Sequence, residues 1–220
     1  MRILAVSDLH GSVETFREIL NQNTSVDIVI LPGDITHFGP GTIVEGLLEI
    51  CRAKGIPLLA VAGNCDTREV DEELLRLGIG LNGRAHILSG VGFHGVSATP
   101  PWQPRMFHYS EEDMAEILLS GFRGLNDCQS HVLVCHVPPF QTKVDRAYFG
   151  RHVGSRSVRD FIMEHQPSLV LCGHIHEARG TDRLGDTLVV NCGFGAKGYY
   201  AVVDLEPGLP PEVILAQVGH

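Results

Sequence analysis

The sequence predicts a layered α/β fold in which two mixed sheets pack together and helices cover their outer faces. Two observations carry this prediction. Residues 1–77 alternate between apolar strand patterns and amphipathic helix patterns, which is typical of a sheet containing parallel strands. Later segments are richer in strand patterns and glycine, which indicates a second group of strands. A chain of 220 residues is long enough for one domain with a substantial core, and we predict a single domain over residues 1–220.

The first part of the chain contains three pairs of a strand and a helix. Ser12 is a candidate N-cap for the first helix, because it precedes a run of helical spacing. The strands are expected at 2–7 (RILAVS), 27–33 (DIVILPG) and 57–63 (PLLAVAG), and the helices at 13–20, 43–53 and 70–77.

The remaining elements are expected to complete both sheets. Residues 86–98 (HILSGVGFHGVSA) are apolar at alternate positions and interrupted by glycine, so they predict a hairpin. Further strands are expected at 131–136, 168–173, 186–192, 198–206 and 212–217, and helices at 111–122 and 158–164. Between the strands, residues 193–198 (GFGAKG) match GxGxxG but precede a strand pattern, so we interpret them as a tight β connection, not a dinucleotide-binding loop.

Charge and composition narrow the function classes. A formal net charge of −9 argues against nucleic-acid binding through a broad basic surface, although bound cations would still attract a small anionic substrate. A strand pattern directly after Met1 predicts no signal peptide, and no apolar run is long enough to span a membrane. The six cysteines show no paired CxxC spacing. These features predict a cytoplasmic protein.

Polar side chains of a restricted kind follow five of the apolar strands. Ligands of open α/β sheets bind beyond the carboxyl ends of the strands, so these side chains are expected to gather in one place. Carboxylate, imidazole and amide donors suit Mn, Fe or Zn, and seven of them suffice for two metal ions. The seven are Asp8, His10, Asp34, Asn64, His136, His174 and His176.

Each of these motifs alone has a simpler explanation. An Asp-x-His triplet or a Gly-Asp pair is common in turns, and a histidine such as His136 at a strand end is often structural. The ordered set DLH, GD, GN, H and GHIH is far more specific. It resembles the signature of the calcineurin-like metallophosphoesterase superfamily, and the resemblance extends from Asp8 to His176 and includes the β-rich tail.

This resemblance implies a fold, a ligand set and a reaction. The fold of the family is a four-layer α/β/β/α sandwich that holds two divalent metal ions. Mn²⁺ is our first expectation for the metal, with Fe²⁺, Ni²⁺ or Zn²⁺ as alternatives. The family's reaction would be in-line attack by a metal-bridging hydroxide on a small phosphate ester. Carried over, Asp8, His10 and His176 would bind one ion, Asn64, His136 and His174 would bind the other, and Asp34 would bridge them.

The stretch GNCD departs from the family's usual GNH[DE]. Cys65 stands where phosphomonoesterases of the family carry the histidine that protonates the leaving group. In this departure the chain resembles a small bacterial and archaeal subgroup of phosphodiesterases. We therefore predict hydrolysis of phosphodiesters or aryl esters in preference to alkyl monoesters. Asp66 is a candidate orienting residue, and His37 is either a substitute acid or an exposed turn residue. Cys65 could also be only a small buried residue.

Residues 137–157 form a long polar loop with several cations. Arg146, Arg151 and His152 are candidate substrate ligands, and the alternative is that they are solvated surface residues. Two other functions remain open at this point. The chain could be an interaction scaffold of the same fold with little catalysis, or a nuclease, although nucleases of the family are longer and carry a DNA-binding cap. No membrane partner is predicted, and an oligomer is possible.

Overall fold

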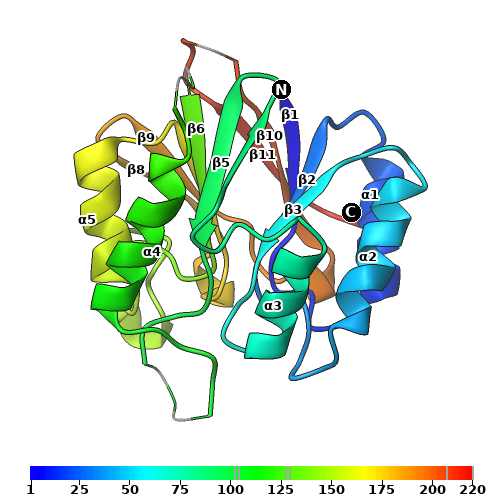
Figure 1. Cartoon of the computed structure of the whole chain (residues 1–220), viewed down its shortest axis with the longest axis horizontal. Helices are drawn as coiled ribbons and strands as arrows, with labels where there is room; N and C mark the ends of the chain where they lie inside the picture. Colours follow the sequence, from blue (N-terminus) through cyan, green and yellow to red (C-terminus); the bar gives the residue numbers. More distant parts are fainter. Residues whose placement is uncertain (102, 104, 127, 129, 207, 220) are drawn as a thin grey trace.

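The chain folds into four layers, with two β-sheets face to face and helices outside both (Figure 1). The computed structural model describes residues 1–101, 103, 105–126, 128, 130–206 and 208–219. Within these residues, no helix has the length and apolar character to cross a membrane. The fold class predicted from the sequence is confirmed.

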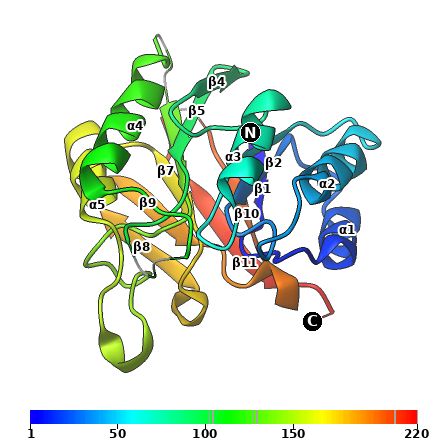
Figure 2. The same cartoon turned by 60° about the horizontal axis from the view of Figure 1, so that its bottom comes forward.

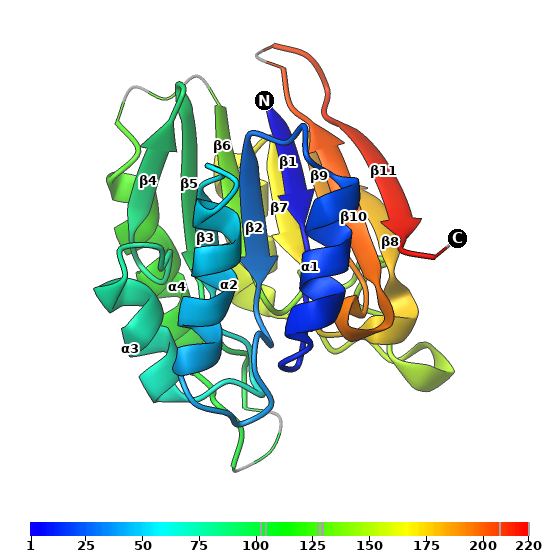
Figure 3. The same cartoon turned by 90° about the vertical axis from the view of Figure 1, so that its right-hand side faces the viewer.

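The first sheet has the strand order β11-β10-β1-β2-β3. Strands β1, β2 and β3 are parallel, and β10 and β11 join them in antiparallel fashion. Helices α1, α2 and α3 cover its outer face (Figure 3). The strands are β1 (Arg2–Ala5), β2 (Ile28–Pro32), β3 (Leu58–Val61), β10 (Tyr199–Asp204) and β11 (Glu212–Gln217), and the helices are α1 (Val13–Gln22), α2 (Thr42–Arg52) and α3 (Arg68–Arg76).

The second sheet has the strand order β4-β5-β6-β7-β9-β8, with four parallel central strands and an antiparallel strand at each edge. Helices α4 and α5 cover its outer face. The strands are β4 (Ala85–Leu88), β5 (Val91–Val96), β6 (Ser130–Cys135), β7 (Leu169–Cys172), β8 (Gly180–Leu184) and β9 (Thr187–Asn191), and the helices are α4 (Glu111–Arg123) and α5 (Arg156–His165).

Strand periodicity explains why the central strands are apolar throughout. Successive side chains of a strand point to opposite faces, and both faces of these sheets are covered. In β1, Ile3 and Ala5 face the core between the two sheets, whereas Leu4 packs beneath the helices of the first layer. A continuous apolar run is therefore the expected pattern for a strand buried on both sides.

Three details differ from the sequence-based expectations. Strand β8 was not predicted, because Leu184 is the one large apolar residue among its five and the one that is buried at this sheet edge. Ser12 does precede α1, but its side chain makes no capping hydrogen bond. Helix α3 begins two residues earlier than expected, where the Thr67 hydroxyl accepts a hydrogen bond from the backbone N–H of Val70 at 3.3 Å.

A cluster of histidines and phenylalanines lies between the second sheet and its helices. The His94 ring on β5 is 5.7 Å from that of His131 on β6, and Phe122 and Phe161 pack against His94. Burial lowers the pKa of His94 to about 3 and that of His131 to about 4. Both rings are therefore neutral in the folded protein at neutral pH.

Acid is expected to destabilise the fold through His94 and His131. The unfolded chain protonates them near pH 6.5, so the stability that they contribute is complete above that pH and is lost as the pH falls toward their folded pKa values. The loss is at most about 1.4 kcal/mol per pH unit for each histidine. Urea unfolding at roughly pH 7.5 and pH 5 measures it. The variant His94→Leu should show a flatter pH dependence, and an unchanged slope would contradict this prediction.

Candidate metal centre

The seven candidate ligands follow β1, β2, β3, β6 and β7 and meet at one edge of the two sheets. Four of them have left-handed backbone conformations, with φ of 57° at Asp8, 45° at His10, 47° at Asp34 and 66° at His174. For a residue other than glycine, a left-handed conformation raises the free energy by about 1–3 kcal/mol. Such conformations persist where the surrounding structure fixes them, often at functional sites. The backbone is therefore strained where the candidate ligands gather.

Two glycines allow the loops to approach one another this closely. A Cβ atom at Gly63 would collide with the carboxylate and backbone of Asp34, and one at Gly173 would collide with Ser7 and the carboxylate of Asp8. Only glycine fits at these two positions without movement of the neighbouring loop. The GN and GH motifs thus owe their glycines to this close packing.

Asp8, His10 and His176 form the first group of donors, whose ligand atoms all lie within 4.8 Å of one another. The Asp8 Oδ1 atom is 3.0 Å from Nε2 of His176. The Phe194 ring stacks on the His176 imidazole at a centroid distance of 4.1 Å and an interplanar angle of 9°. Phe194 belongs to the GFGAKG segment, whose turn leads directly into β10, as the sequence predicts.

Asn64, His136 and His174 form the second group. The Nε2 atom of His136 is 3.1 Å from Oδ1 of Asn64, and the His136 and His174 rings are 5.0 Å apart. The other ring nitrogen of His136, Nδ1, lies 2.9 Å from the carbonyl oxygen of Pro32. This contact orients the ring so that Nε2 is directed at Asn64 and Asp34, and metal-binding histidines are commonly oriented by such a contact of the other ring nitrogen.

Asp34 lies between the two groups. Its Oδ2 atom is 3.7 Å from Nε2 of His10, and its Oδ1 atom is 3.4 Å from Nε2 of His136. The backbone N–H of Cys65 donates a hydrogen bond of 2.7 Å to Oδ1 and holds the carboxylate in this position. One oxygen of Asp34 is thus directed at each group.

The buried carboxylates and imidazoles of the two groups shift one another's pKa values. Burial alone would raise the pKa of Asp34, but the neighbouring His136 holds it below its usual range. Burial would lower the pKa of His136, and the carboxylates of Asp34 and Asp8 raise it to about 9. Burial lowers the pKa of His174 to about 4.

The donor set fits two divalent transition-metal ions. It combines two carboxylates, one amide oxygen and four imidazoles, which is the ligand chemistry of Mn, Fe and Zn. Both ring nitrogens of His10 are buried, and neither has a hydrogen-bond partner in the described part of the chain. Buried polar atoms are almost always hydrogen-bonded, so the His10 ring has the free electron pair that a metal ion would use.

Asp66 joins two of the ligand loops. Its carboxylate accepts hydrogen bonds from the backbone N–H groups of Gly63, Ile35 and Thr36, at 2.8, 3.1 and 2.7 Å, and from the Thr36 hydroxyl at 2.8 Å. Burial and the nearby Asp34 raise the pKa of Asp66 to about 6. Asp66 therefore fixes the turn after β3 against the turn after β2.

Cys65 and His37 lie beside the first group. Their ligand atoms and those of His10 are all within 4.8 Å of one another. Burial, followed by the charge of Asp34, raises the pKa of the Cys65 thiol above its ordinary value, so this thiol stays protonated. The His37 side chain is exposed.

The long loop between β6 and α5 projects away from the two sheets (Figure 2). It folds around the buried Asp145, whose carboxylate accepts hydrogen bonds from backbone N–H groups of the loop and lies 2.6 Å from Nδ1 of His152. Arg146 and Arg151 are exposed on it. The backbone N–H of Tyr148 donates to the carboxylate of Glu177 at 3.0 Å, next to His176, which ties the loop to the first group.

Sequence reasoning missed two residues that contact the ligands. The Sδ atom of Met106 lies 3.2 Å from the amide Nδ2 atom of Asn64, and the ring of Phe194 stacks on that of His176. Met106 carries no motif and lies 42 residues from Asn64 in the sequence. Phe194 could have been suspected only from its position in a tight turn expected near the site.

Known proteins resemble this chain in sequence and in fold. The family model for calcineurin-like phosphoesterases matches residues 1–178. An uncharacterized protein of Methanocaldococcus jannaschii is 34% identical over 203 residues, 87% of each chain. Among solved structures, a Thermus thermophilus protein is similar over 99% of this chain and 98% of its own (TM-score 0.77, 21% identity). A dimetal phosphatase of Danio rerio is similar over 97% of this chain and 98% of its own (TM-score 0.60, 12% identity). These two likenesses show the fold, and the family model and the archaeal relative show that the chain belongs to the calcineurin-like phosphoesterase family.

Proposed function

We propose that this protein is a dinuclear metal-dependent phosphoesterase that hydrolyses phosphodiesters or aryl phosphate esters. The observation that carries the proposal is the position of Asp34, which directs one carboxylate oxygen at each of two donor groups. Two metal ions bound side by side act as a clamp on a phosphoryl group. A shared anionic ligand between two sets of donors would hold the two ions side by side, and Asp34 would be that ligand.

The seven candidate ligands are assigned to two metal ions. Asp8, His10 and His176 would hold one ion, Asn64, His136 and His174 the other, and Asp34 both. Bound there, divalent ions supply Lewis-acid polarisation of the phosphoryl oxygens and a water molecule activated near neutral pH. Two carboxylates against two divalent cations leave an excess of positive charge, so the site attracts phosphate although the whole chain is acidic.

The chain offers no strong general acid for the leaving group at position 65. A buried thiol is a weak hydrogen-bond donor, and its raised pKa disfavours proton release. Esters whose leaving groups depart as stable anions need little help from an acid. This supports placing the chain with the phosphodiesterase-type members that carry GNCD. His37, which lies beside Cys65, is the candidate proton donor.

Metal removal tests the proposal directly. We expect the purified protein to bind two divalent ions per chain and to hydrolyse bis(p-nitrophenyl) phosphate, with Mn²⁺ as the most effective ion. Treatment with EDTA should abolish the activity and added Mn²⁺ should restore it, because the ions supply both the clamp and the activated water. Elemental analysis and release of p-nitrophenolate measure the two quantities. Stoichiometric metal binding without hydrolysis of any ester would favour the scaffold interpretation.

The loop arginines are proposed to bind the phosphate oxygens that are not transferred. The variants Arg146→Met and Arg151→Met should raise KM several-fold and change kcat little, because an interaction made equally in the ground and transition states affects binding alone. Arg52→Met, at an exposed position on α2, is a matched control that removes the same charge elsewhere. Unchanged steady-state constants in both loop variants would place these arginines among ordinary surface residues.

A further inference from the structure

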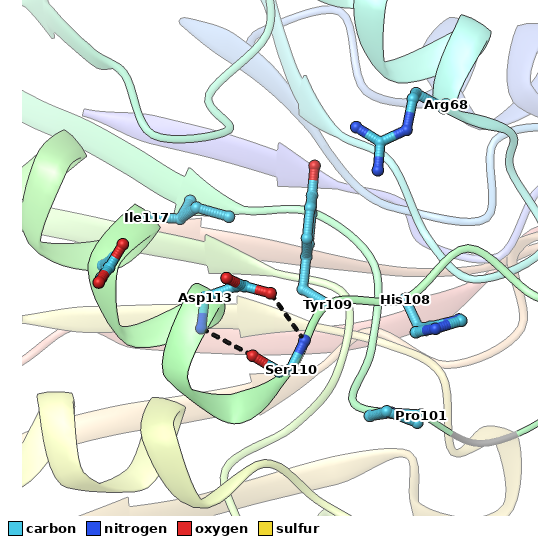
Figure 4. Close-up of a pocket in the computed structure, with 8 residues that line it drawn as sticks. Arg68, Pro101, His108, Tyr109, Ser110, Asp113 and Ile117 are labelled. Carbon is cyan, nitrogen blue, oxygen red and sulfur yellow. Dashed lines mark hydrogen bonds between the residues drawn. The ribbon is translucent and has the colours of Figure 1, made fainter.

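A separate pocket of about 520 Å³ opens between α3 and α4 (Figure 4). Its volume lies within the range of roughly 300–1,000 Å³ that is typical of small-molecule sites. The described residues that give it chemical character are Arg68, His108, Tyr109, Asp113, Glu116 and Ile117. None of them is among the seven candidate metal ligands.

This pocket shares a wall with the metal centre. The wall is the segment between β5 and α4, and two of its residues contact the candidate ligand Asn64. The backbone N–H of Phe107 donates to the carbonyl oxygen of Asn64 at 3.1 Å, and Met106 contacts the Asn64 amide. On the pocket side, the Arg68 guanidinium lies over the Phe107 ring at 5.6 Å. The segment that separates the pocket from the metal centre therefore contacts both, and a substituent of a bound ester that extends across this segment would reach the pocket.

Tyr109 is held in place by a buried polar network. The Asn82 amide donates to the Tyr109 hydroxyl at 3.2 Å and to the buried Asp71 carboxylate at 2.7 Å. Asp71 also accepts a hydrogen bond from Ser97 at 2.5 Å, and the Ser97 hydroxyl in turn accepts one from the backbone N–H of Ala62, which lies two residues before Asn64. The ring is thus fixed before any ligand arrives, which lowers the entropic cost of binding.

The charges and rings of the pocket select a chemical class of ligand. Arg68 lies 5.9 Å from the centre of the Tyr109 ring, and Figure 4 shows the two beside the hollow, with Asp113 across from Arg68. Asp113 and Glu116 outweigh the single arginine, so the lining disfavours a polyanion such as a second phosphate chain. A ring can stack on Tyr109, while the guanidinium and the carboxylates offer partners to its polar groups.

We propose that this pocket binds an aromatic or heterocyclic substituent of the phosphate ester, so that Tyr109 and Arg68 determine specificity for esters that carry such a ring. The proposal rests on the proposed function, because it assigns one side of the substrate of the same site. It adds a substrate class that the metal ligands alone do not define.

Two diesters with the same leaving group test the proposal. Thymidine 5′-(p-nitrophenyl phosphate) and methyl p-nitrophenyl phosphate both release p-nitrophenolate, and only the first retains a heterocyclic ring. We expect kcat/KM of the wild-type protein with Mn²⁺ to be at least tenfold higher for the thymidine ester. Equal values for the two diesters would overturn the proposal, although the enzyme would still be a phosphoesterase.

The variants separate a role in stacking from a role in structure. Tyr109→Leu removes the ring and should reduce the ratio of kcat/KM for the thymidine ester to kcat/KM for the methyl ester toward one. Tyr109→Phe keeps a ring and should keep the wild-type ratio. Both variants lose the hydrogen bond from Asn82, so equal loss in both would show that Tyr109 acts only through that network and would overturn the proposal. Arg68→Met should also reduce the preference, and Arg52→Met on α2 is its matched control.

Binding of free thymidine decides the question independently of hydrolysis. Saturation-transfer NMR with wild-type protein should show contact with the thymine ring, and the signal should be lost in Tyr109→Leu. Absence of binding by the wild-type protein would count against the pocket. If neither diester is hydrolysed while thymidine binds and Tyr109→Leu abolishes the binding, the proposed function fails and the pocket assignment stands.

Discussion

Replacing Asp34 with asparagine is expected to reduce kcat for bis(p-nitrophenyl) phosphate by more than about 10³-fold. Asparagine keeps the acceptor for the Cys65 N–H bond but removes the negative charge that lies between the two donor groups. Without that charge, His10 and His136 lose the carboxylate that attracts cations toward both of them. The variant should also bind fewer metal ions, because the shared ligand would be neutral.

Two measurements separate this effect from loss of the fold. Elemental analysis reports bound metal, and circular dichroism with thermal unfolding reports whether the two sheets still form. The matched control is Asp160→Asn, an exposed position on α5, which should retain the wild-type rate. Asp34→Asn with full metal content and undiminished turnover would show that no shared carboxylate is needed, and the dinuclear proposal would fail.

The fold could be predicted well from sequence because its strands are buried on both faces. A strand that is covered on both faces buries every side chain, which gives short continuous apolar runs such as Ile28–Pro32. The connecting helices are amphipathic, so their apolar residues recur at helical spacing instead. The edge strand β8 escaped prediction because its side chains GTDRL are mostly polar and partly exposed. Edge strands have one neighbour, so burial constrains their sequence less.

The candidate ligands were accessible to sequence reasoning because parallel strands bring their carboxyl ends together. Polar residues at those ends are therefore neighbours in space, however far apart they lie in the chain. The residues that contact and orient these ligands cannot be predicted by the same rule. The contacts of Met106 with Asn64 and of Phe194 with His176 depend on how irregular loops fold. The same holds for Asp66, which accepts three of its four hydrogen bonds from the turn after β2.

The environment of Cys65 supports the proposed preference for esters with good leaving groups. Its backbone N–H donates to Asp34, its Sγ atom lies 3.4 Å from the Asn64 amide, and its buried thiol is near the carboxylates of Asp34, Asp66 and Asp8. The first two contacts make Cys65 part of the framework of the site. Burial and the nearby carboxylates raise the pKa of its thiol, so the thiol releases a proton poorly. His37 lies within reach of the same cluster but is exposed. Under the proposed function, a leaving group that must be protonated as it departs would therefore have no buried acid beside it at Cys65 and would depend on the exposed His37.

We accordingly expect kcat/KM for an alkyl monoester to be about 10²–10⁴-fold lower than for an aryl diester, which is the range that a positioned general acid contributes. Cys65→His should narrow this gap by at least about tenfold, because an imidazolium can protonate an alkoxide, whereas Cys65→Ser should not. Parallel assays of β-glycerophosphate by phosphate release and of bis(p-nitrophenyl) phosphate by absorbance measure the gap. Equal efficiency on both esters in the wild-type protein would mean that an acid acts in this site after all, and His37→Gln would then identify whether the exposed imidazole provides it.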